Sequence, residues 1–217
     1  MNSKEKSKII LRELNKIYPK VPIPLNYKNT FTLLISVLLS AQCTDVNVNN
    51  VTKNIYPKYN HPKHFVKLGR KKIEQLIKKI GIFRIKAKSI YFLSKTLVEK
   101  YKSKVPRTYE ELENLPGVGH KTASVVMSQA FGYPAFPVDT HIHRLAQRWG
   151  LTNGKNVVQT EKDLKKIFPK KHWNKLHLQI IWYGREYCKA RDCYGISCKI
   201  CKSCYPSRKK SIKTKKA

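Results

Sequence analysis

Residues 115–123 form the stretch Leu-Pro-Gly-Val-Gly-His-Lys-Thr-Ala, which decides how the rest of the chain is interpreted. Gly117 and Gly119 indicate a tight hairpin, and Lys121 follows where a new helix would begin. Glycines let backbone N–H groups approach a ligand closely, and the first turn of a helix attracts anions such as phosphate. The stretch therefore predicts a phosphate-binding hairpin between two helices, although an ordinary glycine-containing helix–helix turn would give the same pattern.

A second informative segment, Val138-Asp139-Thr140-His141, follows one helix length later. Asp139 stands where helix N-caps commonly place a carboxylate. A reactive amine at Lys121 and a carboxylate at Asp139, beside a phosphate-binding hairpin, indicate covalent chemistry on nucleic acid. Taken singly, Lys121 could serve only to bind a phosphate and Asp139 only to cap a helix. The two together favour catalysis.

The charge of the chain points to a polyanionic partner. Its 217 residues include 45 Lys and Arg against 13 Asp and Glu, which gives a formal net charge of +32. Such an excess is the usual electrostatic footprint of nucleic-acid binding. Lys, Ile, Asn and Tyr are all abundant, as biased nucleotide composition would produce, so some lysines can be ordinary solvated surface. The charge therefore indicates an anionic partner without defining a function.

Apolar residues recur at helical spacing through most of the chain. Helices are indicated around residues 9–17, 73–80, 90–98 and 164–168, and the first, second and fourth of these are followed closely by Pro19, Gly81 and Pro169. Long alternating runs of β-branched residues, which would indicate strands, are absent from the sequence. The pattern predicts an all-α protein.

No segment is apolar enough to cross a membrane. The longest apolar run, residues 31–39, is broken by Thr32 and Ser36 and is shorter than the roughly 18 residues that a spanning helix needs, so it predicts a buried helix. Residues 1–6 are polar, with no apolar core behind them, so we expect no secretory signal and a cytoplasmic, nucleoid-associated protein. The basic tail, residues 207–217, is expected to be disordered.

The cysteines gather near the C-terminus. Five of the six lie within one short segment: Cys188, Cys193, Cys198, Cys201 and Cys204. Without a secretory signal, disulfides are the poorer explanation. The Cys-x2-Cys-x2-Cys spacing lets thiolates converge on one centre, as in cubane iron–sulfur proteins, although Cys-x2-Cys pairs also suit tetrahedral zinc. The spacing therefore predicts a loop organised by a metal, and Cys43, which stands apart, is assigned to packing.

Further motifs accompany the hairpin: residues 38–45 (Leu-Leu-Ser-Ala-Gln-Cys-Thr-Asp), 154–157 (Gly-Lys-Asn-Val) and 183–185 (Tyr-Gly-Arg) ahead of Cys188. With these motifs in this order, the chain resembles the endonuclease III family of DNA glycosylases, within the helix–hairpin–helix superfamily. The resemblance runs from about Leu11 to Cys204.

This resemblance implies two helical domains with DNA bound between them. One is a six-helix, barrel-like domain over residues 23–133, with the helix–hairpin–helix at about 108–131. The other combines residues 1–22 with 134–206 and holds an iron–sulfur cluster. The protein is expected to act as a monomer on double-stranded DNA that contains damaged bases or abasic sites.

The resemblance also assigns roles to single residues. It makes Lys121 the nucleophile and Asp139 the catalytic carboxylate. The residues that it assigns to DNA binding are Gln42 and Ile82, which fill the space left by an extruded nucleotide, and Gly117, Val118, Gly119 and His120 of the hairpin.

The activity implied is that of a bifunctional DNA glycosylase and abasic-site lyase of base excision repair. Such an enzyme removes oxidised pyrimidines through a lysine Schiff base and cleaves on the 3′ side by β-elimination. Relatives that excise adenine lack a lysine at position 121 and carry a glutamate where Val37 stands here. A mismatch- or purine-directed glycosylase on the same scaffold is the alternative, and a non-catalytic DNA-binding module is another.

The metal loop departs from the family pattern, which usually spaces its ligands C-x6-C-x2-C-x5-C. Aligned without gaps, Cys188, Cys198 and Cys204 fall on the first, third and fourth ligands, while Gly195 falls on the second. We expect Cys201 to complete the ligands of a [4Fe–4S] cluster, because Cys-x2-Cys spacing flanks it on both sides. Cys193 is the alternative.

Overall fold

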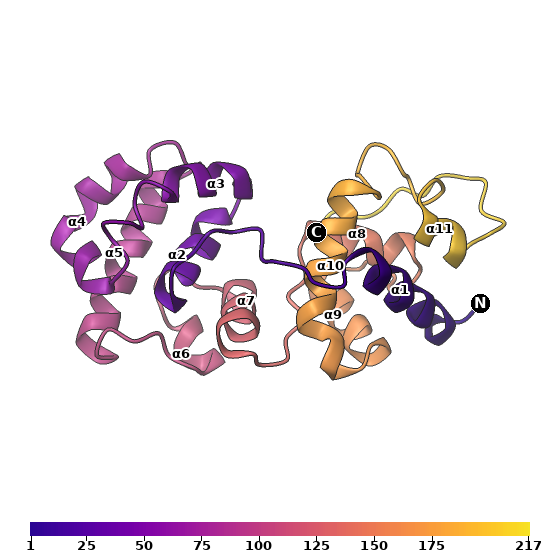
Figure 1. The fold of residues 1–217 in the computed structure, drawn as a ribbon, viewed down its shortest axis with the longest axis horizontal. Helices are drawn as coiled ribbons and strands as arrows, with labels where there is room; N and C mark the ends of the chain where they lie inside the picture. The colour runs from indigo at the N-terminus through magenta and orange to yellow at the C-terminus, as the bar shows by residue number, and fades with distance from the viewer. The chain divides into compact units, whose positions relative to one another are not determined.

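The computed structural model describes residues 1–217, and it contains helices joined by turns and loops, with no strand (Figure 1). The prediction of an all-α protein is confirmed. The chain divides into two compact units. We call residues 23–133 the hairpin unit, and residues 1–22 together with 134–217 the cysteine unit. None of the helices combines the length and the apolar composition needed to cross a membrane.

The hairpin unit is built around one helix that is apolar on all sides. Its six helices are α2 (Thr30–Ser40), α3 (Asp45–Thr52), α4 (Pro62–Leu76), α5 (Phe83–Lys100), α6 (Tyr109–Glu113) and α7 (His120–Phe131). Every side chain of α2 from Phe31 to Leu39 is buried. A helix that is hydrophobic all round belongs in the interior, and α3, α5 and α7 all contact α2.

Two polar residues interrupt the apolar run of α2, and both find partners inside the unit. Thr32 closes the start of the helix in a capping box with Asn29. The hydroxyl of Ser36 lies 2.9 Å from the carbonyl oxygen of Asn26 and 2.6 Å from the hydroxyl of Tyr56. Because buried polar groups cost free energy when unpaired, these bonds allow the helix to stay in the core.

The cysteine unit joins the N-terminal helix to the last third of the chain. It contains α1 (Ser3–Ile17), α8 (Thr140–Arg148), α9 (Val157–Ile167), the short 3-10 helix η1 (Lys170–His172), α10 (Trp173–Glu186) and α11 (Lys199–Cys204). Helix α1 contacts α9, α10 and α11. The side-chain amide of Gln179 donates to the carbonyl oxygens of Leu14 at 3.3 Å and Tyr18 at 2.9 Å, which satisfies the end of α1.

Two residues of the basic tail make hydrogen bonds to the rest of the cysteine unit. The guanidinium of Arg208 donates to the carbonyl oxygens of Arg148 at 2.7 Å and Gly195 at 3.0 Å. Further along, the backbone N–H of Lys215 donates to the side chain of Gln147 at 2.8 Å. These bonds attach residues 208–215 to the end of α8 and to the cysteine-rich loop.

Candidate active site and cysteine cluster

The hairpin of residues 115–119 fits closely against the core of its unit. Gly117 has a φ of 80°, in the left-handed region. A Cβ atom at this position would lie 2.7 Å from Cβ of Ser89 and 3.2 Å from Cδ1 of Leu38. Val118 is buried, so its side chain anchors the hairpin from within. Glycine is therefore required at position 117 by both backbone conformation and space.

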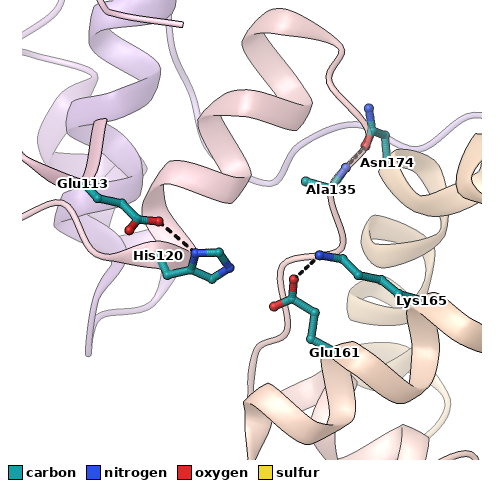
Figure 2. A network of polar contacts seen from close by, with 6 residues as sticks. All are labelled: Glu113, His120, Ala135, Glu161, Lys165 and Asn174. Carbon is teal, nitrogen blue, oxygen red and sulfur yellow. Dashed lines mark hydrogen bonds and ion pairs between the residues drawn. The ribbon is translucent and has the colours of Figure 1, made fainter. Parts of the chain in front are cut away.

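Helix α7 begins directly after the hairpin, with Gly119 as its N-cap and no side chain that caps its first turn. The first N–H groups of a helix have no partner within the helix, and together with the helix dipole they favour an anion. The side chain of His120, the first residue of α7, is held by α6, because its Nδ1 lies 2.8 Å from the carboxylate of Glu113 (Figure 2). Its ring also stacks on Tyr109, with ring centroids 5.7 Å apart. The hairpin therefore presents a helix start that suits a phosphate.

Lys121 lies in the first turn of α7 and is exposed. The other face of the helix is anchored in the core by Ala123, Val126 and Met127, all of which are buried. The orientation of α7 is therefore set by burial of one face, which leaves the amine of Lys121 accessible to a large substrate.

Gln42 and Ile82 occupy two strained turns of the hairpin unit. Gln42 follows the end of α2 with a φ of 54°, and Ile82 precedes α5 with a φ of 50°. A left-handed backbone costs a residue with a side chain about 1 kcal/mol or more, and it is rare for a β-branched residue. Both side chains are exposed. A Cβ atom on Gly81 would lie 3.5 Å from the carbonyl oxygen of Gln42, so the two turns are in contact.

Asp139 is the N-cap of α8 in the cysteine unit. Its Oδ1 accepts a hydrogen bond of 2.8 Å from the backbone N–H of Ile142. Ile142 and Leu145 are fully buried, so the helix that carries the carboxylate is fixed in the core. The carboxylate itself is half-buried. The structure therefore places Asp139 at the helix start expected from the sequence, in a different unit from Lys121.

The cysteine-rich loop brings four thiols together. The sulfur atoms of Cys188, Cys193, Cys198 and Cys201 all lie within 4.8 Å of one another and are buried. The Sγ of Cys201 lies 3.9 Å from that of Cys188 and 3.8 Å from that of Cys193. All of these cysteines are free of disulfides. Four converging, buried sulfur atoms form a donor set that can hold a metal cluster.

The thiols of this group interact with one another. Hydrogen bonds with Cys188 and Cys201 lower the pKa of Cys198, whereas hydrogen bonds with Cys188 and Cys198, together with burial, raise the pKa of Cys201. The two separations from Cys201, 3.8 and 3.9 Å, are close to the edge of about 3.8 Å of a tetrahedron with 2.3 Å metal–sulfur bonds. A cubane is larger, and its four ligands would stand further apart.

The structure brings together three of the four expected ligands. Cys188, Cys198 and Cys201 belong to the group, but its fourth member is Cys193 in place of Cys204. Cys204 is buried at the end of α11, where burial raises the pKa of its thiol to about 11. Cys43 lies apart, in the hairpin unit.

Two arginines that were not among the expected site residues bind the start of this loop. The buried guanidinium of Arg148 donates to Sγ of Cys188 at 3.2 Å, and it also reaches the carbonyl oxygens of Cys188, Lys189 and Ala190. Arg144 donates to the carbonyl oxygens of Gly184 at 2.9 Å and Cys188 at 3.1 Å. The i, i+4 spacing of the two arginines, which places them on one face of α8, is the sequence signal that could have identified them.

The fold and these sites define a class of protein. Residues 35–170 match the family model described as HhH-GPD superfamily base excision DNA repair protein, and the chain belongs to that superfamily. Over 204 residues the chain is 41% identical to Endonuclease III of Bacillus subtilis (strain 168), covering 94% of this chain and 93% of that protein. Endonuclease III of Escherichia coli (strain K12) is 42% identical over 198 residues, covering 91% and 94%. The chain is therefore a member of the endonuclease III family of DNA glycosylase/AP lyases.

A solved structure extends this similarity to three dimensions. The structure of a trapped endonuclease III–DNA covalent intermediate, an estranged-adenine complex, matches with a TM-score of 0.87 and 43% sequence identity. The match covers 92% of this chain and 94% of that one. A non-covalent endonuclease III–DNA complex matches equally well.

Proposed function

We propose that this DNA glycosylase/AP lyase removes oxidised pyrimidines from double-stranded DNA and then cleaves the strand 3′ to the abasic site, with Lys121 as the nucleophile. The observation that carries the proposal is the exposed amine of Lys121 in the first turn of an uncapped helix that follows a glycine hairpin. Support comes from a relative at 43% identity that has been trapped covalently on DNA. The enzyme is proposed to act as a monomer.

The first step is extrusion of the damaged nucleotide, which costs least when the base is already poorly stacked. Gln42 and Ile82 are proposed to fill the vacated space. Backbone N–H groups at the start of α7, with Gly117, Val118, Gly119 and His120 shaping the turn, bind a nearby phosphate. A net charge of +32 supplies the long-range attraction to DNA.

The chemical steps follow from an amine and a carboxylate. The neutral amine of Lys121 attacks C1′ of the sugar, the bond from C1′ to the base breaks, and the base leaves with the bonding electrons and takes up a proton. Asp139 stabilises the positive charge that develops on the sugar and assists proton transfer. Opening of the ring gives a Schiff base between Lys121 and C1′. Loss of a proton from C2′ then expels the 3′ phosphate and cleaves the strand.

The cysteine cluster is proposed to hold a [4Fe–4S] group on Cys188, Cys193, Cys198 and Cys201, the four cysteines whose sulfur atoms converge; binding of the group would spread these atoms beyond the present separations of 3.8 and 3.9 Å. These four thiolates would hold the group, and the hydrogen bond from Arg148 to Sγ of Cys188 would connect the loop that carries it to α8. The chemistry at Lys121 requires no electron transfer. The role of the cluster is therefore to fix the loop.

Borohydride trapping on a duplex with one defined lesion tests the nucleophile. Wild-type protein should form a stable cross-link, whereas Lys121→Gln should lose cross-linking, base release and strand cleavage by at least about a thousandfold. DNA affinity should change little, because many groups bind the phosphates. Lys58→Gln, an exposed lysine of the same unit, is the charge-matched control.

Cross-linking that survives in Lys121→Gln would assign the chemistry to another amine. Wild-type protein that binds DNA but never cross-links would make the chain a non-catalytic DNA-binding module. A panel of duplexes with single lesions separates pyrimidine from purine substrates. The buried apolar Val37 on α2, where adenine-excising relatives carry a glutamate, favours pyrimidines.

A further inference from the structure

The hairpin unit contains one lysine that the proposed chemistry does not use and that is almost fully buried. Lys86, on the first part of α5, is 3% exposed. Lysine is among the residues least often buried without a partner. Its ammonium group donates to the carbonyl oxygen of Leu39 at 2.9 Å and to that of Ala41 at 2.6 Å. Lys86 therefore spans from α5 to the end of α2.

The two carbonyl oxygens that Lys86 binds are a site where a cation is favoured. The last carbonyl groups of a helix have no partner within the helix and carry its partial negative charge. Ala41 is the C-cap of α2, and Gln42 comes next in the chain. Burial lowers the pKa of Lys86, while Cys43 raises it. Hydrogen bonds to the two carbonyl oxygens replace the hydration that the ammonium group loses on burial.

A second contact fastens the same turn to the loop before α5. The side-chain amide of Asn47 donates to the carbonyl oxygen of Lys79 at 2.9 Å, and it lies 3.2 Å from Sγ of Cys43. The turn that contains Gln42 is therefore tied to α5 by Lys86 and to the segment before Ile82 by Asn47. Both Gln42 and Ile82 hold left-handed backbones, which persist only where the surroundings enforce them.

We propose that Lys86 is a positioning residue for DNA recognition, which holds the turn of Gln42 against the turn of Ile82 so that both side chains enter the duplex together. The inference rests on the proposed function, in which these two residues fill the space left by the extruded nucleotide. Lys86 acts through the backbone of the Gln42 turn and never touches DNA. Its burial separates it from Lys121, the exposed lysine that carries the chemistry.

The test compares Lys86→Met with Lys88→Met. Methionine keeps an unbranched chain of similar length but cannot donate to the two carbonyl oxygens, and Lys88 is an exposed lysine on the same helix. Single-turnover rates are measured for base removal from a duplex with one oxidised pyrimidine, and for cleavage of a preformed abasic site. An intact base must be unstacked before reaction, whereas an abasic sugar is extruded at little cost.

Lys86→Met should slow base removal by about tenfold or more and change abasic-site cleavage by less than about threefold. Lys88→Met should change neither the rate of base removal nor the rate of abasic-site cleavage. In a Gln42→Ala background, Lys86→Met should add little further loss, because non-additivity is the signature of residues that act as a unit. Fluorescence of a 2-aminopurine placed opposite the lesion reports directly whether the space is filled.

Thermal unfolding of each variant shows whether the fold survives. If Lys86→Met does not fold, Asn47→Leu, which removes the other tie, replaces it and should show the same selective loss. A folded Lys86→Met that loses both activities equally, or neither, overturns the positioning role. If Gln42→Ala and Ile82→Ala leave base removal unchanged, the space-filling roles fail as well; if those two are impaired and Lys86→Met is not, only the inference on Lys86 fails.

Discussion

The two units fix their candidate site residues in different ways. In the hairpin unit, backbone conformation does most of the positioning, because Gly117, Gln42 and Ile82 all lie in the left-handed region and α7 starts without a side-chain cap. In the cysteine unit, hydrogen bonds of side chains position the site residues: the carboxylate of Asp139 caps α8, and the guanidinium of Arg148 binds Sγ of Cys188. A site built on backbone turns tolerates changes of surface side chains, whereas a site built on side chains depends on each donor. Single substitutions can distinguish positioning by backbone conformation from positioning by side-chain hydrogen bonds.

The largest expected effect is loss of the metal from the cysteine unit. Cys193→Ser should lose bound metal and several kcal/mol of stability, since metal binding is coupled to folding in such loops, whereas Cys204→Ser should keep its metal. Metal analysis of both purified variants provides the measurement, with about four irons per chain expected for the wild type. The opposite pattern would restore Cys204 as the fourth ligand. One zinc per chain without iron would make the loop a zinc site.

A smaller loss should follow removal of the arginine that binds the loop. Arg148→Met leaves the carbonyl oxygens of Lys189 and Ala190 without their side-chain donor and removes the hydrogen bond to Sγ of Cys188, and we expect the free energy of unfolding to fall by about 3 kcal/mol. Denaturant unfolding measures the change. Arg191→Met, an exposed arginine of the same loop, is the control. Equal stability of the two variants would contradict the anchoring role of Arg148.

In the hairpin unit, two glycines two residues apart should behave very differently. Gly117→Ala combines a left-handed backbone with a contact of 2.7 Å, so we expect a loss of about 2 kcal/mol and weaker DNA binding. Gly119→Ala meets nothing within 4 Å and should cost less than about 1 kcal/mol. Thermal unfolding and DNA titration of both proteins decide the matter. Similar losses at both positions would argue against a hairpin fixed by backbone conformation.

The smallest effect on stability is expected for Asp139→Asn. Asparagine caps helices as well as aspartate does, so the free energy of unfolding should change by less than about 0.5 kcal/mol. Base removal should nevertheless slow by at least about a hundredfold, because the amide carries no charge to stabilise the sugar cation. Cleavage of a preformed abasic site should fall much less. Matching losses on the two substrates would reduce Asp139 to a structural cap.

Much of the fold could be predicted because it follows local rules. The apolar run of residues 31–39 predicted a buried helix, and the segment around Asp139 predicted an N-cap; both are observed. The left-handed turns at Gln42 and Ile82 could not be predicted, since neither residue favours that conformation. Burial of Lys86 was equally hidden, because a lysine within a helical pattern normally indicates a solvated face. Whether Cys193 joins the other cysteines depends on the path of an irregular loop, and the spacing of cysteines in the sequence does not determine that path.

Membership of α1 in the cysteine unit has a consequence for the order in which the chain folds. The hydrogen bond from Gln179 to Leu14 joins residues 165 positions apart, with the whole hairpin unit lying between them. During synthesis, residues 23–133 leave the ribosome long before the partners of α1 exist, and domains generally fold as units in that order. A 15-residue helix is only marginally stable alone in water. Helix α1 therefore finds its packing partners only after the C-terminal third has been made, and closing this long loop comes late in folding.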